Sequence, residues 1–213
     1  KLTESKKSFN GFELRKPHIN ETLIGYEINQ LKFLIPLLNS SKSAFMWDIT
    51  NEPRSTTISV ERFGQWVKTM ADTIRSTGDT HYITLGGAWD NFEDQRPYAQ
   101  YLDVVSIHYY CCAKSPHIKS SFESYVKMFQ STGKPVILQE FGANTNNQET
   151  EQMQANYYSW ILNECDKLGI AGVLPWTLWD FPTVDWDPVE ANFGVIRADG
   201  SWKPSAYVFR DWA

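Results

Sequence analysis

The 213-residue sequence has no long apolar run and little excess of positive charge anywhere. About 20 consecutive apolar residues are needed to cross a bilayer, and no run approaches that length. Asp and Glu number 25 against 20 Lys and Arg, which leaves a net charge of −5. Nucleic-acid backbones are bound by clustered Lys and Arg, and the only basic clusters are short ones near the start. The sequence therefore predicts neither a membrane-spanning nor a nucleic-acid-binding protein.

Cysteine and histidine are also scarce. The three cysteines include the vicinal pair Cys111-Cys112, which does not match a C-x-x-C spacing and whose redox state the sequence leaves open. The four histidines show no H-E-x-x-H or similar metal-ligand spacing. Asp180, Asp185 and Asp187 do not have the spacing of an EF-hand loop, and we interpret them as polar substrate contacts or solvated residues. We predict no metal and no cofactor.

Aromatic residues, in contrast, are abundant at 15% of the chain, and nine of them are tryptophans. Tryptophan most often packs in a core, but an indole face also stacks on the apolar face of a sugar ring. About one third of these tryptophans are expected in a binding cleft.

Short apolar segments alternate along the chain with amphipathic stretches. The apolar segments predict strands at 44–49, 82–85, 104–107, 135–138 and 172–174 with its flanks. Helical spacing predicts helices at 22–38, from Ser59 to Gly78, from 122 to Gly133, from 153 to Gly169 and at 203–212. Pro36 is expected to bend or shorten the last turn of the first helix. Such alternation predicts an α/β protein with a parallel sheet.

Two parallel architectures fit this alternation, an open doubly wound sheet and a closed β/α barrel. The open dinucleotide-binding kind carries G-x-G-x-x-G after its first strand, and neither this motif nor a P-loop is present. Polar and aromatic residues instead follow the predicted strands, which is where a barrel has its active site. We therefore expect a TIM (β/α)8 barrel.

Two glutamates directly follow predicted strands, Glu52 and Glu140. A carboxylate at the end of an apolar strand is costly unless it faces a polar cleft. Cleavage of a glycosidic bond needs two carboxyl groups, one to protonate the leaving oxygen and one to attack the anomeric carbon or activate a water. The two positions therefore indicate a pair of catalytic carboxyl groups.

The ends of four predicted strands carry, in this order, Asn51-Glu52-Pro53, His108-Tyr109-Tyr110, Gln139-Glu140-Phe141-Gly142 and Trp176. This series resembles glycoside hydrolase family 5 of clan A. The resemblance covers the chain from about residue 44 to the end. It identifies the five predicted strands with strands four to eight of the barrel.

The resemblance implies a role for each matched residue. It makes Glu52 the acid/base and Glu140 the nucleophile of a retaining reaction. Asn51 would then bond the sugar 2-hydroxyl, and Tyr110 would donate a hydrogen bond to the nucleophile. His108, and Trp176 beneath the sugar at the cleavage point, would complete this set.

Further aromatic residues follow the same strands, and we interpret Trp89 and Trp179 as lining the cleft. Each of these residues also has a purely structural interpretation. Glu52 would be a helix-start residue, Glu140 an ion-pair partner and His108 a satisfied core histidine. The tyrosine and the tryptophans would be core packing.

A full barrel has eight strands, so five leave the architecture incomplete. We interpret residues 1–213 as one catalytic domain, the C-terminal portion of a barrel. An N-terminal segment absent from the sequence, or a second chain, would supply strands one to three and the arginine that the family carries there. The alternative is a minimal protein that pairs with itself.

We predict a retaining hydrolase of β-linked glucan or mannan, whether polysaccharide or oligosaccharide, and expect secretion from that substrate class. A non-catalytic carbohydrate-binding barrel, or an inactive fragment, is the first alternative. A metal-dependent barrel hydrolase is the second, and the lack of ligand spacing counts against it. The sequence leaves the polysaccharide, endo or exo action and the oligomeric state open.

Overall fold

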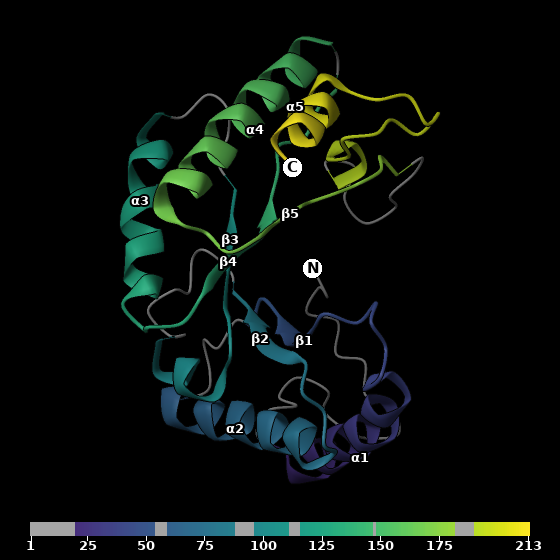
Figure 1. Cartoon of the computed structure of the whole chain (residues 1–213), viewed down its shortest axis with the longest axis vertical. Helices are drawn as coiled ribbons and strands as arrows, with labels where there is room; N and C mark the ends of the chain where they lie inside the picture. Colours follow the sequence, from purple (N-terminus) through teal and green to yellow (C-terminus); the bar gives the residue numbers. More distant parts are fainter. Residues whose placement is uncertain (1–19, 54–58, 88–95, 111–115, 147, 182–189) are drawn as a thin grey trace. The chain divides into compact units, whose positions relative to one another are not determined.

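The computed structural model describes residues 20–53, 59–87, 96–110, 116–146, 148–181 and 190–213. The chain forms two compact units, Lys1–Val105 and Ser106–Ala213 (Figure 1). We call them unit 1 and unit 2 and describe each by itself.

Unit 1 pairs two parallel strands with two helices. Its elements are α1 (Glu21–Leu38), β1 (Met46–Asn51), α2 (Val60–Ser76), β2 (Tyr82–Gly86) and the 3-10 helix η3 (Arg96–Tyr101). The strands pair from Met46 opposite Tyr82 to Asn51 opposite Gly86. β1 starts and ends two residues later than predicted, because pairing with β2 continues as far as Asn51.

Helix α2 shows why the sequence forms a helix at this point. The Ser59 hydroxyl caps its start by accepting the Arg62 N–H at 3.2 Å. The helix ends before Gly78, whose φ of +83° suits a residue without a side chain. Both predicted boundaries are confirmed. Helix α1 agrees with the predicted range to within one residue, and it continues through Pro36 to Leu38, so the proline does not shorten it.

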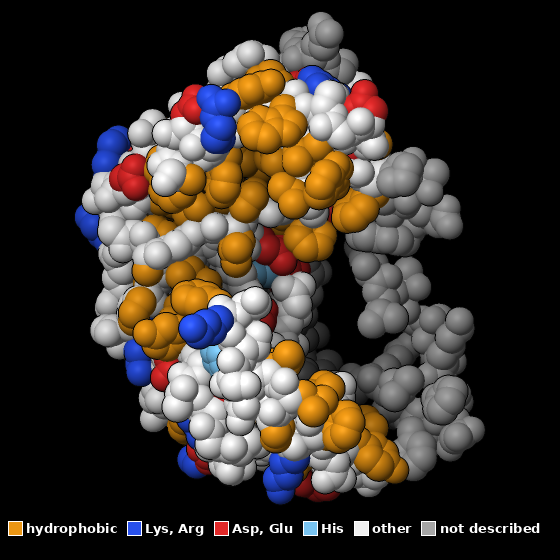
Figure 2. Space-filling view, turned by 45° about the vertical axis from the view of Figure 1, so that its right-hand side comes forward, with side chains coloured by type: hydrophobic (Ala, Val, Ile, Leu, Met, Phe, Trp, Pro, Cys, Tyr) orange, Lys and Arg blue, Asp and Glu red, His pale blue; other side chains and the backbone are white. Residues whose placement is uncertain are grey.

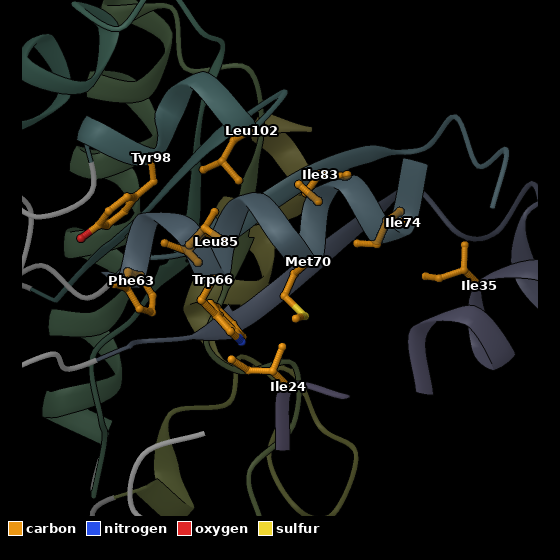
Figure 3. Close-up of a cluster of buried hydrophobic side chains, with 12 residues drawn as sticks. Ile24, Ile35, Phe63, Trp66, Met70, Ile74, Ile83, Leu85, Tyr98 and Leu102 are labelled. Carbon is orange, nitrogen blue, oxygen red and sulfur yellow. The ribbon is translucent and has the colours of Figure 1, made fainter. Parts of the chain in front are cut away.

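The apolar face of α2 builds the core of unit 1 against β2, η3 and α1 (Figure 3). Trp66 lies 4% exposed in this core, and its indole N–H donates to Glu27 of α1 at 2.8 Å. The side chains labelled in Figure 3 are Ile24, Ile35, Phe63, Trp66, Met70, Ile74, Ile83, Leu85, Tyr98 and Leu102. The apolar residues of α2 recur at helical spacing because they all face this core.

Unit 2 carries the remaining strands in the order β3-β4-β5. Its elements are β3 (Val105–Tyr109, beginning at the last residue of unit 1), α3 (Pro116–Gln130), β4 (Val136–Phe141), α4 (Gln148–Leu168), β5 (Val173–Pro175), the 3-10 helix η4 (Glu190–Asn192) and α5 (Pro204–Trp212). All five predicted strands and helices exist in the chain. The 3-10 helices η3 and η4 were not predicted.

Helices α3 and α4 bury one face of β4. Phe141 is fully buried and contacts the rings of Tyr157 and Tyr158 on α4. Because successive side chains of a strand point to opposite faces, Glu140 points away from α4. Cys165 of α4 is buried, and burial raises the pKa of its thiol to about 12.

Large hydrophobic side chains gather on the face of unit 2 seen in Figure 2. The exposed ones in this unit are Leu174, Leu178, Trp179, Phe181, Trp202 and Tyr207. Within the described part of the chain, none of the helices has the length and apolar character needed to cross a membrane. Parallel strands that alternate with helices confirm the α/β class.

Candidate active site

The end of β1 holds Glu52 in an unusual backbone conformation. Its φ is +44°, in the left-handed region that residues with a side chain rarely adopt. The Glu52 N–H donates to the Gly86 carbonyl of β2 at 2.9 Å, which fixes the residue in this conformation. Backbone strain of this kind is found where the surrounding structure holds a functional residue.

Asp48 joins the ends of β1 and β2 just before Glu52. Its Oδ1 accepts the Gly86 N–H at 2.9 Å and the Thr50 N–H at 3.2 Å. This residue was not predicted to support the site, although an acidic residue inside an apolar strand is itself a signal. Asn51, the last residue of β1, is exposed.

In unit 2, the ends of β3 and β4 bring three of the predicted residues together. The Tyr110 hydroxyl donates to Glu140 Oε2 at 2.6 Å. His108 Nδ1 lies 3.4 Å from the same oxygen, and the His108 side chain is fully buried. A hydrogen bond donated to a carboxylate favours its ionised form, which is the form a nucleophile needs.

Strand alternation explains why His108 and Tyr110 share this face. The residue between them, Tyr109, points to the helices, where its ring contacts Phe122 and its hydroxyl lies 3.0 Å from Ser121. Its neighbours on either side therefore point the other way. The second ring nitrogen of His108 lies 3.4 Å from Gln139 Oε1. Gln139 was not predicted, although it directly precedes Glu140.

Trp176 follows β5 and is bonded to the last residue of β4. β4 and β5 pair with Phe141 opposite Pro175, and the Trp176 N–H donates to the Phe141 carbonyl at 2.9 Å. Gly142 makes this approach possible, because a Cβ there would lie 2.3 Å from the Trp176 carbonyl oxygen. The indole N–H donates to Glu190 at 2.9 Å.

Glu190 belongs to a segment that borders Trp176 and Tyr110. The Phe193 carbonyl accepts the Thr177 N–H at 3.4 Å, and the Phe193 ring stands edge-on to Tyr110 with centroids 6.0 Å apart. Sequence reasoning missed this segment because η4 has no helical or strand period. No spacing in the sequence connects Glu190 with Trp176.

Asp180 has a different role from the one predicted. It is 10% exposed, and its Oδ1 accepts from Lys203 Nζ at 2.8 Å. The buried lysine also donates to Thr145 at 2.7 Å. Because an unpaired buried ammonium is costly, Asp180 serves this ion pair, and its interpretation as a substrate contact or solvated residue is wrong.

Trp179 and Trp89 are the two further tryptophans predicted to line a cleft. Trp179 is described and is 50% exposed, and its place in a cleft stays a prediction. Trp89, Asp185, Asp187 and the pair Cys111-Cys112 lie outside the described residues. The expectation of no metal and no cofactor also stays a prediction.

A family model described as cellulase, glycosyl hydrolase family 5, matches residues 34–182. Among curated proteins, the chain is 26% identical to mannan endo-1,4-β-mannosidase 5 of Arabidopsis thaliana, over 80% of the chain and 50% of that protein. It is also 27% identical to a β-glucuronidase of Paenibacillus borealis, over 86% of the chain and 31% of that protein. The chain thus spans half or less of the length of these relatives.

Solved structures share the fold. A Bifidobacterium dentium β-glucuronidase matches with a TM-score of 0.78 at 21% identity, over 92% of this chain and 34% of its own. An exo-β-1,4-mannosidase from Opitutaceae bacterium strain TAV5 matches with a TM-score of 0.78 at 19% identity, over 97% of this chain and 42% of its own. These proteins are TIM barrels, so the predicted fold is confirmed.

Proposed function

Because the chain belongs to glycoside hydrolase family 5, we propose that it cleaves β-linked polysaccharides or oligosaccharides by a two-glutamate double displacement. The observation that carries the proposal is the 2.6 Å hydrogen bond from Tyr110 to Glu140 at the end of β4. It supports Glu140 as the nucleophile. Glu52, at the strained end of β1, is the proposed acid/base.

The reaction would proceed in two steps. Glu140 attacks the anomeric carbon while Glu52 protonates the leaving oxygen, which gives a covalent glycosyl-enzyme. Glu140 has then lost its charge, so Glu52 in its ionised form can act as a base toward water. Water attack releases the sugar with its original β configuration. Asn51 would bond the 2-hydroxyl, where a hydrogen bond strengthens as positive charge builds on the ring.

The proposed substrates are β-mannan and β-glucan. The names of the relatives divide between mannosidases and β-glucuronidases, which act on a neutral and an acidic sugar respectively. Trp176 would supply the stacking surface under the sugar, together with the proposed cleft residues Trp179 and Trp89. Secretion is proposed from this substrate class. We also propose that the protein needs no cofactor and binds neither nucleic acid nor membranes.

A closed barrel has eight strands, while the described residues contribute five. We propose that the remaining strands come from another segment of the same protein or from a second chain.

The test is reducing-sugar release from a panel of β-mannans and β-glucans, comparing the chain with its Glu140→Gln variant. Glu164→Gln on α4 is the matched control, because it removes a negative charge from a helix surface. Release that Glu140→Gln abolishes and Glu164→Gln preserves would support the hydrolase and identify the polysaccharide. Sugar binding without release, unchanged in Glu140→Gln, would favour the non-catalytic carbohydrate-binding barrel instead.

A further inference from the structure

The carboxylate of Glu190 lies at the edge of the proposed sugar platform, and the proposed function gives it no role. The Trp176 indole N–H donates to Glu190 Oε2 at 2.9 Å. Both side chains are partly exposed. A negative charge is therefore held beside the ring on which the sugar would stack.

Backbone hydrogen bonds fix this carboxylate in place on the segment that follows β5. The Phe181 N–H donates to the Ala191 carbonyl at 2.9 Å, and the Val195 N–H donates to the Thr177 carbonyl at 3.1 Å. The segment reaches the nucleophile as well, because Phe193 contacts Tyr110. Glu190 thus belongs to the same local structure as Tyr110 and Glu140.

The cations of the same region are already engaged by other carboxylates. Lys203 is paired with Asp180 at 2.8 Å, and Arg197 is paired with Glu151 at 2.6 Å. Among the ion pairs of the described residues, none includes Glu190. The charge of the Glu190 carboxylate is therefore not offset by any ion pair among the described residues.

We propose that Glu190 is a specificity-determining residue, whose carboxylate beside Trp176 makes the site select neutral sugars and reject uronic acids. A uronic acid carries a carboxylate where a neutral hexose carries a hydroxymethyl group. Like charges brought close together at a partly desolvated site repel each other. This inference rests on the proposed function, because it places the sugar on Trp176.

The experiment compares binding of methyl β-D-glucoside and methyl β-D-glucuronide to the 213-residue chain, by isothermal titration calorimetry in low salt. The two ligands differ only at C6. We expect the glucoside to bind about tenfold or more tightly than the glucuronide. In Glu190→Gln the amide oxygen still accepts the indole N–H, but the charge is gone, so this ratio should fall about tenfold.

Two controls separate charge from structure. Glu123→Gln removes a charge from an exposed ion pair on α3 and should leave the ratio unchanged. In the unmodified chain, the ratio should shrink as salt rises from ~0.01 M to ~1 M, because salt screens charge repulsion. The salt titration needs no variant, so it tests the proposal even if Glu190→Gln does not fold.

The outcomes separate this inference from the proposed hydrolase. Equal binding of both glycosides, no binding of either, or a ratio unaffected by Glu190→Gln and by salt would overturn the specificity role. Tighter binding of the glucoside without any hydrolysis would support the specificity role of Glu190 and count against the proposed hydrolase. Hydrolysis of β-mannan with equal binding of the two glycosides would support the hydrolase and overturn the specificity role.

Discussion

The Tyr110 hydroxyl donates a hydrogen bond to the Glu140 carboxylate at 2.6 Å, and Tyr110→Phe removes this bond. A hydrogen bond to a charged group contributes about 1.5–3 kcal/mol. Because the carboxylate is the proposed nucleophile, we expect kcat to fall about 10- to 100-fold, with a smaller change in KM. Steady-state kinetics on the best substrate of the panel measure this. Tyr207→Phe, on the exposed face of α5, should leave both constants unchanged.

Glu52 tests the strain at the end of β1. An L-residue in the left-handed region costs about 1–2 kcal/mol, which glycine does not incur. Glu52→Gly should therefore raise the free energy of unfolding by about 1 kcal/mol relative to Glu52→Ala, while both variants lose turnover. Urea unfolding followed by circular dichroism compares the two. Equal stability of the two variants would argue against strain at this position.

The residues of the site differ in how well the sequence predicts them. Glu52 and Tyr110 directly follow strands, and His108 and Glu140 lie in the last residues of β3 and β4. A place at the end of a strand therefore identifies all four. The roles of Glu190 and Asp48 could not be predicted, because their hydrogen-bond partners lie in segments far apart in the sequence. Lys203 was predicted only as part of a helix, and its burial is not visible in any local pattern.

The segment after helix α1 and the turn before strand β2 meet at Asp79, which is buried, and His81, which is partly buried. Asp79 is 3% exposed, its carboxylate lies 3.1 Å from His81 Nδ1, and the other ring nitrogen lies 3.2 Å from the Ser41 carbonyl. The hydrogen bond with Asp79 raises the pKa of His81, and partial burial lowers it less. For Asp79, burial is the largest single effect and raises the pKa of the carboxyl group. The hydrogen bonds from His81 and Trp47 together outweigh burial, so the pKa lies below its ordinary value.

The raised pKa of His81 gives the stability of unit 1 a defined pH dependence. Its contribution is fully present below the unfolded pKa of about 6.5 and is lost as pH rises through the higher folded pKa. The loss of unfolding free energy in His81→Gln should therefore be larger at pH 5.5 than at pH 8.5. Urea titrations at the two pH values measure it. In an Asp79→Asn background the difference should disappear, and its persistence there would refute the pairing.

The start of α5 holds the segments after β4 and β5 through one buried lysine. Lys203 is 1% exposed and donates to Asp180 and Thr145. Burial lowers the pKa of its ammonium group, and the bond with Asp180 opposes this effect. Removal of one member of a buried ion pair leaves the other unpaired, which costs about 3–5 kcal/mol.

Lys203→Met should therefore lower the free energy of unfolding by about 3–5 kcal/mol. Replacing Asp180 by Leu in the same chain should restore much of this loss, because no unpaired charge then remains. The exposed Lys127→Met on α3 is the control and should change stability little. A small loss in Lys203→Met alone would mean that water or another group satisfies Asp180.

Strands and helices were predicted well where one repeating pattern decides them. Gly78, Gly133 and Gly169 each follow a helix with positive φ, so their residue type alone marks the ends of α2, α3 and α4. The predicted extent of α1 is confirmed, but Pro36 does not shorten its last turn, because a proline near a helix end removes one hydrogen bond without ending a helix that packs through Ile35. The 3-10 helices were missed because they are too short to show a period.

For the molecule as a whole, the family and the fold are established, and the reaction's stereochemistry is the decisive prediction that remains. Glu52 belongs to unit 1 and Glu140 to unit 2, so the proposed pair takes one residue from each unit. A retaining pair requires carboxyl groups about 5–5.5 Å apart, and an inverting pair leaves about 6.5–9.5 Å for a water.

We therefore expect the first product of β-mannan or β-glucan cleavage to be the β anomer. Proton NMR during the first minutes of hydrolysis, before mutarotation, distinguishes the two anomers. Azide should restore turnover in Glu140→Ala and give the α-glycosyl azide, because azide replaces the missing nucleophile on the opposite face. In Glu52→Ala, azide should attack the covalent intermediate and give the β-glycosyl azide. An α anomer as the first product of the unmodified chain would establish inversion and remove the nucleophile role from Glu140.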